Sequence, residues 1–196
     1  MNLWLNTNQQ IIILITSFIG GKWLINDDEL DVFFNLYSGE VKQNKAMHIT
    51  ERHNANFGPI IIDFDFKYPK QISSPISIDI VDGIIGNLTN IIKQSFDHCN
   101  DFTCIVSKRK TIYKDARGKY KDGIHIIFPY IVTLYDYQFY LRNEYMKIME
   151  NDIKDVIKYC DVNDRKIDAV YDKSVIKDNN WFVYMSTKPN TYPYII

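Results

Sequence analysis

The stretch from Pro59 to Tyr68 reads PIIIDFDFKY, and its pattern guides the interpretation of the whole chain. Because side chains alternate between the two faces of a β-strand, its even-numbered residues, all large and apolar, face one side. Asp63 and Asp65 face the other side. Asp is depleted in strands, and its apolar neighbours here predict a buried strand in the interior of a sheet. The alternative is an edge strand whose solvent-exposed face happens to carry two acids.

The spacing of these two acids suggests metal binding. At about 3.3 Å per residue, the Cα atoms of Asp63 and Asp65 lie roughly 6.5 Å apart. Both carboxylates can then bind one divalent cation, or a pair of cations about 3.5–4 Å apart. The stretch therefore predicts a metal site on one face of the strand.

The composition limits the class of protein. The 196 residues suffice for one substantial core, and a net charge of −1 gives no overall attraction to nucleic acid or anionic membranes. The cysteines, Cys99, Cys104 and Cys160, are odd in number and unsuitably spaced, which argues against a disulfide framework. His98, Cys99 and Cys104 lack the second ligand pair of a zinc site. The apolar run over residues 11–15 is too short to span a bilayer and has no basic leader. We therefore expect an intracellular protein that is not secreted.

The periodicity of the remaining chain predicts a mixed α/β (α+β) fold. Helices are expected over residues 26–39, 78–96 and 134–159, and further strands over 11–15, 102–106, 121–129 and 179–189. The polar segment over residues 41–58 is expected to be a surface loop. It leads into the carboxylate strand, which makes Arg52 and His53 candidates for a phosphate contact.

Positive charge gathers in one segment that follows the strand predicted over residues 102–106. Its basic residues are Lys108, Arg109, Lys110, Lys114, Arg117, Lys119 and Lys121, against the single acid Asp115. We expect a mobile hairpin with Gly118 at its tip. The basic side chains up to Lys119 are candidates for binding the DNA backbone, and a merely solvated loop is the alternative.

The hairpin leads into the strand over residues 121–129. By alternation Lys121, Gly123 and His125 share one face of this strand. A histidine on a strand is often a hydrogen-bonded structural residue. Here a lysine and a glycine share its face, which favours a row that contacts phosphate, with the glycine admitting the ligand close to the backbone.

Five blocks, in this order, resemble the archaeo-eukaryotic primase superfamily, and most closely the primase domain of the primase-helicases of poxviruses and other nucleocytoplasmic large DNA viruses. The blocks are Arg52-His53, Phe57-Gly58-Pro59, Asp63-Phe64-Asp65, Lys121-Asp122-Gly123-Ile124-His125 and Asn179-Asn180-Trp181. No single block is specific, but their order and spacing extend over nearly the whole chain.

The resemblance implies a role for each matching residue. Asp63, Asp65 and Asp172 would hold two Mg²⁺ or Mn²⁺ ions and act as the catalytic acids. The triphosphate of the incoming nucleotide would meet Lys121 and His125 on the row that includes Gly123. Asn180 and Lys188 would lie near the nucleotide or the primer strand. The resemblance also implies a two-lobed primase fold, in which a catalytic lobe similar to an RNA-recognition motif faces an N-terminal α/β lobe.

The sequence departs from the family pattern in two places. Phe182 or Val183 stands where cellular relatives often have an arginine, so one phosphate contact is missing or is supplied elsewhere. Met185 stands where the viral relatives commonly have glycine, which bears on the backbone geometry at that position. No phosphate-binding loop of an ATPase occurs before Ile196.

The main hypothesis is therefore a single primase or primase-polymerase domain over residues 1–196, without the helicase domain. It would carry out metal-dependent, template-directed nucleotidyl transfer in viral DNA replication. Expected partners are a single-stranded DNA template, NTP or dNTP, and a superfamily 3-type helicase in cis or in trans. The expected location is the host cytoplasm or a viral factory. The alternatives are a metal-dependent nuclease and a non-catalytic nucleic-acid-binding module with this fold.

Overall fold

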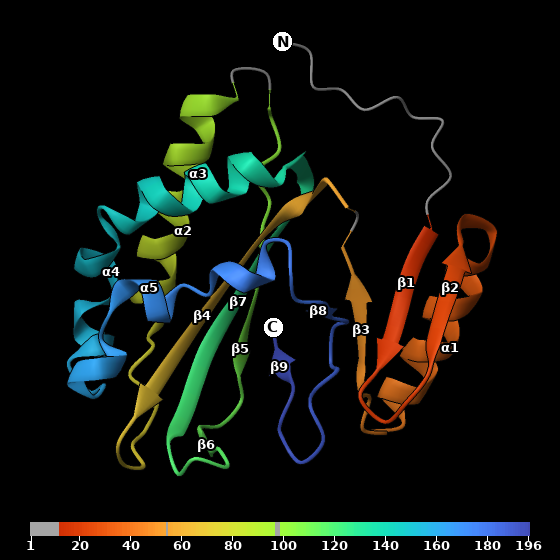
Figure 1. The fold of residues 1–196 in the computed structure, drawn as a ribbon, viewed down its shortest axis with the longest axis horizontal. Coiled ribbons are helices and arrows are strands. Elements are labelled where there is room, and N and C mark those ends of the chain that lie inside the picture. Colours follow the sequence, from red (N-terminus) through yellow and green to blue (C-terminus); the bar gives the residue numbers. More distant parts are fainter. Residues whose placement is uncertain (1–11, 54, 97–98) are drawn as a thin grey trace.

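The computed structural model describes residues 12–53, 55–96 and 99–196, and it contains two antiparallel sheets (Figure 1). The first sheet has the order β2-β1-β3-β8 and comprises β1 (Ile12–Ser17), β2 (Lys22–Asn26), β3 (Ile49–Arg52) and β8 (Trp181–Phe182). The second sheet has the order β4-β7-β5-β9, with β6 paired to β7. Its strands are β4 (Phe57–Tyr68), β5 (Ile105–Arg109), β6 (Tyr113–Lys114), β7 (Tyr120–Leu134) and β9 (Tyr194–Ile195).

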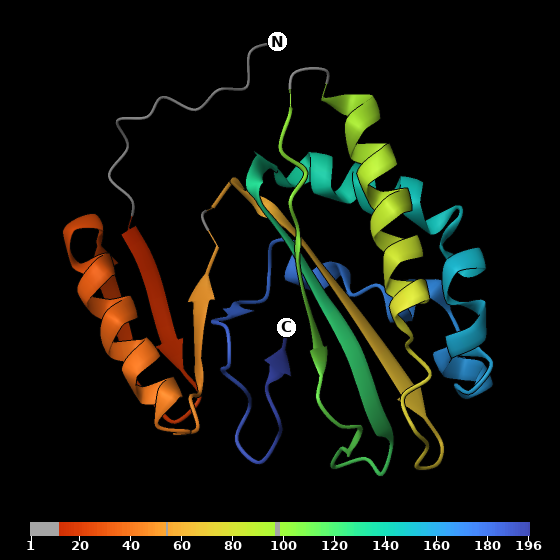
Figure 2. The same ribbon diagram turned by 180° about the vertical axis from the view of Figure 1, so that it is seen from behind.

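Helices cover the outer faces of both sheets, as the two opposite views show (Figures 1 and 2). Beside the first sheet lies α1 (Leu30–Lys42), which follows the 3₁₀ turn η1 (Asp27–Glu29). One face of the second sheet is covered by α2 (Ile78–Ser95), α3 (Tyr135–Met146) and α4 (Met149–Ile157). The short elements η2 (Val162–Asp164), α5 (Ile167–Val170) and η3 (Lys173–Val175) lead back along β4. The mixed α+β class is confirmed.

The alternation predicted for β4 is confirmed. Its residues Ile60, Ile62 and Phe64 are fully buried against α2, α3 and α4, together with matching side chains of β7 such as Ile124. Asp63 and Asp65 lie on the opposite face. One face of the β4–β7 pair thus forms the core, and the other is left for the site.

The predicted interior position of this strand is wrong, because β7 is the one strand of the described residues that pairs with β4, and β4 lies at the end of the strand order. Its other edge is instead covered by the chain after α5. Phe64 forms an isolated antiparallel bridge with Tyr171, and the Asp172 N–H donates to the Asp63 carbonyl at 3.0 Å. The strand is therefore buried even though it is an edge strand, which explains its apolar composition.

The predicted helices also differ in their ends. The helix expected over 134–159 is divided into α3 and α4 around Lys147 and Ile148, and the two halves both pack on α2. The helix α1 begins at Leu30 rather than at 26, and Asn26 instead forms a capping box with the 3₁₀ turn η1, its N–H donating to the Glu29 carboxylate at 3.0 Å. The predicted stop at Gly39 is wrong, because α1 continues to Lys42.

Two segments differ in secondary structure from the prediction, because tertiary contacts rather than local sequence determine them. The expected loop over 41–58 contains β3, which is short and polar and is held by pairing with β1 and β8. The expected strand over 179–189 is reduced to β8, and the chain then turns through Ser186 and Thr187, which bond to the β3 region. In the apolar run over 11–15, Ile11 lies outside the described residues. His98 of the weak zinc candidate also lies outside them, and its neighbours Cys99 and Cys104 are half-buried free thiols.

Candidate active site

A cleft of about 580 Å³ lies between the two sheets. Its lining includes most of the predicted site residues, namely Asp63, Asp65, Lys121, His125, Asp172, Asn180 and Lys188. The non-core faces of β4 and β7 supply the first four, and the chain that follows α5 supplies the others. The fold thus brings together residues that are up to 125 positions apart in the sequence.

The acids create a strong local negative potential. Burial, together with the neighbouring Asp65 and Asp172, raises the pKa of Asp63 well above its usual value. Arg109 and Lys121 act in the opposite direction but do not cancel this effect. Within the described chain, the buried Oδ1 atom of Asp63 has no hydrogen-bond partner. These carboxylates therefore repel one another unless a proton or a cation joins them.

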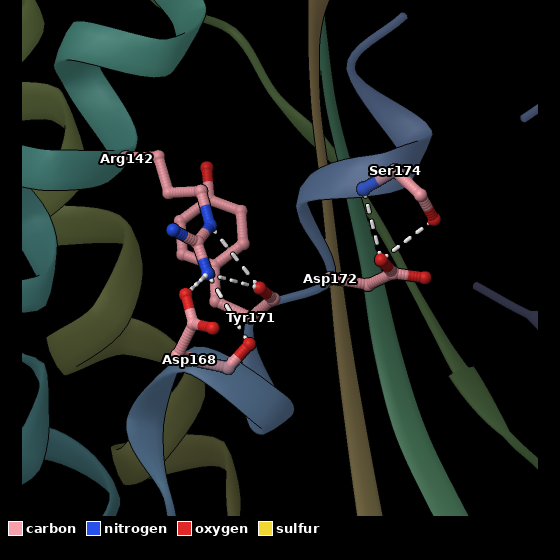
Figure 3. A network of polar contacts seen from close by, with 5 residues as sticks. All are labelled: Arg142, Asp168, Tyr171, Asp172 and Ser174. Atoms are coloured by element: carbon pink, nitrogen blue, oxygen red, sulfur yellow. Dashed lines mark hydrogen bonds and ion pairs between the residues drawn. The ribbon is translucent and has the colours of Figure 1, made fainter. Parts of the chain in front are cut away.

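The position of Asp172 is fixed by a polar network around the edge of β4 (Figure 3). The buried Arg142 donates from Nε and Nη2 to the Tyr171 carbonyl at 3.1 and 2.8 Å, and its Nη2 atom also reaches the Asp168 carboxylate at 2.7 Å. The Asp172 Oδ1 atom accepts from the Ser174 N–H and hydroxyl at 2.9 and 2.7 Å. This network holds Asp172 beside Asp63.

The three aspartates suit a hard divalent cation in charge and in donor type, since Mg²⁺ and Mn²⁺ prefer carboxylate oxygen. A bound cation would also offset their mutual repulsion and provide a partner for the Oδ1 atom of Asp63. They do not form a closed ligand shell: within the described ranges, no three acidic, histidine or cysteine side chains are placed to hold a metal ion. Asp63, Asp65 and Asp172 are thus candidate metal-binding residues by their chemistry and proximity, and the metal role stays a prediction.

His125 lies directly opposite Asp63 on the paired strands, with Nε2 3.4 Å from the Asp63 Oδ1 atom. Its ring stacks on Tyr194, with the ring centroids 3.5 Å apart, and contacts Trp181 at 4.6 Å. Burial and the nearby Arg109 lower the pKa of His125 well below its usual value, so the ring is neutral. A neutral imidazole carries one N–H, which limits His125 to a single donated hydrogen bond.

Gly123 faces Asp65 across the strand pair, and it is needed for a reason that the sequence did not reveal. A Cβ atom at this position would lie 2.6 Å from the Phe64 carbonyl oxygen and 2.8 Å from the Tyr194 hydroxyl. The glycine therefore makes room for the Phe64 backbone carbonyl and the Tyr194 side chain. In this structure that space is not open to a ligand, contrary to the prediction.

Asn180 is held by the first sheet. Its Nδ2 atom donates to the Thr16 hydroxyl at 2.7 Å and to the Thr50 hydroxyl at 3.1 Å, which ties the cleft wall to β1 and β3. Lys188 lines the cleft and is exposed. Arg52 is exposed at the end of β3 and is not among the residues that line the cleft, so the structure does not place it with the predicted phosphate contacts.

The basic segment divides into groups with different surroundings. Lys108 donates to the Ile76 carbonyl at 2.7 Å, and Lys119 forms ion pairs with Asp161 and Asp164. Arg109 points into the cleft. The hairpin has Gly118 at its turn, with φ +83°, as predicted. The basic side chains of this segment that are exposed are Lys110, Lys114 and Arg117.

Sequence reasoning missed four residues of this region: Phe18, Arg109 as a cleft residue, Arg142 and Tyr194. Strand alternation places Arg109 opposite to Lys108 and is the signal that would have separated them. Phe18 stacks on Phe182 at a centroid distance of 5.7 Å, and both line the cleft.

The structure describes no helix that is long and apolar enough to cross a membrane.

Residues 15–196 match the family described as the C962R protein N-terminal AEP domain, where AEP denotes archaeo-eukaryotic primase. The chain belongs to this family. The resemblance found in the sequence is thus confirmed. Met185 adopts a left-handed backbone with φ +68°, a conformation that favours glycine, and it stands where the viral relatives of this family commonly have glycine. Met185 thus adopts a left-handed backbone that glycine would reach at a lower steric cost.

A relative in Acanthamoeba polyphaga mimivirus, named putative helicase L207/L206, is 33% identical over 180 residues. The match covers 90% of this chain but only 18% of the relative. The likeness therefore concerns one segment of a much longer viral protein.

Proposed function

We propose that this AEP domain is a DNA primase or primase-polymerase that performs metal-dependent, template-directed nucleotidyl transfer in viral DNA replication. The observation that carries the proposal is the convergence of Asp63, Asp65 and Asp172 with Lys121 and His125 on one cleft between the sheets. Carboxylates for a cation and donors for phosphate are both required for this chemistry.

We also propose that the second sheet is the catalytic lobe and is similar to an RNA-recognition motif. The order β4-α2-β5-β7-α3 follows the β-α-β-β-α pattern of such lobes, and the segment at Tyr171 takes the place of a last strand beside β4. The first sheet with α1 would then be the N-terminal lobe. Both lobes would act as one domain, because the cleft residues come from both.

Each group of residues has a proposed task. Two Mg²⁺ or Mn²⁺ ions, when bound by the three aspartates, would activate the 3′ hydroxyl of the primer and neutralise the phosphates of the nucleotide. Lys121 adds a positive charge beside these acids, and His125 donates one N–H without adding charge. Asn180 and Lys188 shape the opposite wall, where the nucleotide or primer would lie.

The template is proposed to follow the basic hairpin and the aromatic wall. Lys110, Lys114 and Arg117 are exposed and suited to the phosphate backbone. Phe18, which is 48% exposed, and Phe182 offer ring faces on which bases can stack. The mimivirus relative is named a helicase, so we propose that a helicase acts with this domain, either in the same polypeptide or as a partner.

The test is to incubate the chain with single-stranded DNA, Mn²⁺ and labelled NTP or dNTP. Template-dependent extension is expected, and it should be lost in Asp63→Ala and Asp65→Ala. Degradation of the DNA instead would identify a nuclease. DNA binding without either reaction would identify a non-catalytic module.

A further inference from the structure

A column of stacked side chains crosses the floor of the cleft. The Arg109 guanidinium lies 4.2 Å from the centre of the Tyr194 ring and 4.9 Å from that of Tyr113. The Tyr194 ring also stacks on His125, with centroids 3.5 Å apart and planes inclined by 15°. Because Tyr194 belongs to β9, which pairs with β5 at Arg109, backbone pairing fixes this arrangement. The guanidinium is thus held against the Tyr194 ring in the cleft.

Arg109 is placed like a ligand-binding residue rather than a structural one. Its Nε atom is buried and has no hydrogen-bond partner within the described ranges, and no ion pair of its guanidinium within 4.0 Å is found there. By contrast, Arg142 donates to several acceptors, and Arg165 reaches the Cys160 and Lys158 carbonyls at 2.8 and 3.0 Å. A buried donor left unpaired is unfavourable, so its location in the cleft indicates an acceptor that arrives with a ligand.

The charge around Arg109 indicates what that ligand is. Arg109 and Lys121 line the same cleft as the three aspartates, so the site carries positive as well as negative side chains. A planar guanidinium suits two oxygens of one phosphate, and stacking on Tyr194 preserves its orientation. A nucleotide whose phosphates bind Arg109 and Lys121, and which arrives with a divalent cation for the aspartates, satisfies both kinds of charge.

We propose that Arg109 binds the phosphates of the incoming nucleoside triphosphate, and that Tyr194 is the positioning residue that holds the guanidinium in place. This inference rests on the proposed nucleotidyltransferase function and adds a phosphate contact outside the row of Lys121 and His125. It removes Arg109 from the set that binds the template backbone.

The test measures binding of dATP, dAMP and inorganic triphosphate to the chain by calorimetry, without DNA and with Ca²⁺ as a cation that does not support turnover. Arg109→Gln should weaken dATP and triphosphate binding about 10- to 100-fold, the range expected for a lost hydrogen bond to a charged partner. Binding of dAMP should change much less. Lys70→Gln, which removes an exposed charge outside the cleft and outside the basic hairpin, is the control and should leave all three affinities unchanged.

Two variants of Tyr194 test the positioning role. Tyr194→Phe keeps the ring between Arg109 and His125 and should keep triphosphate affinity within about threefold, whereas Tyr194→Leu should approach the loss of Arg109→Gln. Circular dichroism and the melting temperature identify any variant that is unfolded. If Arg109→Gln is unfolded, Arg109→Lys serves as the milder change, and an intermediate loss of triphosphate affinity is expected.

A purely electrostatic role of Arg109 predicts different changes in Ca²⁺ and triphosphate affinity. If Arg109 only offsets the negative charge of Asp63, its removal should strengthen Ca²⁺ binding and leave triphosphate affinity unchanged or higher, which would overturn the inference. A wild-type chain that extends primers while Arg109→Gln binds dATP normally would overturn the inference and leave the proposed function standing. A wild-type chain that binds neither dATP nor triphosphate would overturn both.

Discussion

The backbone N–H of Asp172 donates to the backbone carbonyl of Asp63 at 3.0 Å. This bond joins two proposed metal-binding acids that lie more than one hundred residues apart in the sequence. It depends on the preceding residue, because Tyr171 packs against Phe64 with ring centroids 5.0 Å apart and its carbonyl is held by Arg142. The geometry of the acids therefore rests on a buried arginine that does not enter the cleft.

Arg142→Met should destabilise the protein and weaken metal binding together. The buried Tyr171 carbonyl would lose its donor, which costs about 1–3 kcal/mol, or roughly 2–4 °C in melting temperature for each kcal/mol. Asp168→Asn is the control, because Asp168 is 67% exposed and its ion pair should contribute less than about 1 kcal/mol. Thermal melts and Mn²⁺ titrations on both variants test this. Equal effects of the two changes would contradict the role given to the Arg142–Tyr171 contact.

Asp63→Asn should stabilise the metal-free protein in a pH-dependent way. The folded protein raises the pKa of Asp63, so the wild-type protein is favoured below the unfolded-state pKa of about 4 and loses that stability as pH rises through the folded value. The variant lacks this loss. Its advantage should thus be smallest near pH 4 and largest near pH 8, as measured by melting temperature in the presence of a chelator. An advantage independent of pH, or a similar profile for the exposed Asp82→Asn, would refute this account.

Gly123→Ala should destabilise the fold, because the added Cβ meets the Phe64 carbonyl and the Tyr194 hydroxyl below 3.0 Å. A loss of about 1–3 kcal/mol is expected for such overpacking. Gly83→Ala is the matched control: in the middle of α2, its Cβ would meet nothing within 4 Å, so it should stabilise the protein by about 0.5–1 kcal/mol. Chemical denaturation of both variants provides the measurement. A neutral effect at Gly123 would mean that the space is open after all.

The exposed part of the basic hairpin should govern DNA affinity. Replacing Lys110, Lys114 and Arg117 with glutamine should weaken single-stranded DNA binding for all sequences and reduce the salt slope by about 0.7 for each lost contact, or about 2 in total. Lys119→Gln should instead leave the slope unchanged, because Lys119 is already paired with Asp161 and Asp164. Binding titrations at several salt concentrations distinguish the two. An unchanged slope in the triple variant would make the hairpin a solvated loop.

The sequence predicted what depends on local pattern. The alternation of β4 and β7 determines which residues face the cleft, so Asp63, Asp65, Lys121 and His125 were found together. The edge position of β4 was not predictable, because its partner at Tyr171 is remote in the sequence. Arg142 lies in a helical pattern that gives no sign of its buried acceptors. Strand alternation separates Arg109 from Lys108, but the contacts of Lys108 with Ile76 and of Lys119 with Asp161 are not encoded in any local pattern.

His125 provides the sharpest test, because its ring is both packed and polar. It is only 7% exposed between Trp181 and Tyr194, so His125→Ala should leave a cavity and destabilise the protein by about 2–4 kcal/mol whatever its role. That variant alone cannot separate scaffold from site. His125→Phe keeps an aromatic ring in the stack and removes only the nitrogen atoms, one of which faces Asp63.

If the His125 N–H contacts the triphosphate, His125→Phe should retain most of the melting temperature and Mn²⁺ affinity but raise the nucleotide KM about 10- to 100-fold, as expected for a lost hydrogen bond to a charged partner. His125→Gln, which restores an N–H donor without the ring, should recover part of the KM and lose stability. Nucleotide KM, Mn²⁺ affinity and melting temperature are to be measured on the same preparations. A normal KM in His125→Phe would show that the ring acts through packing alone, and the donor to phosphate would then have to be Lys121 or Arg109.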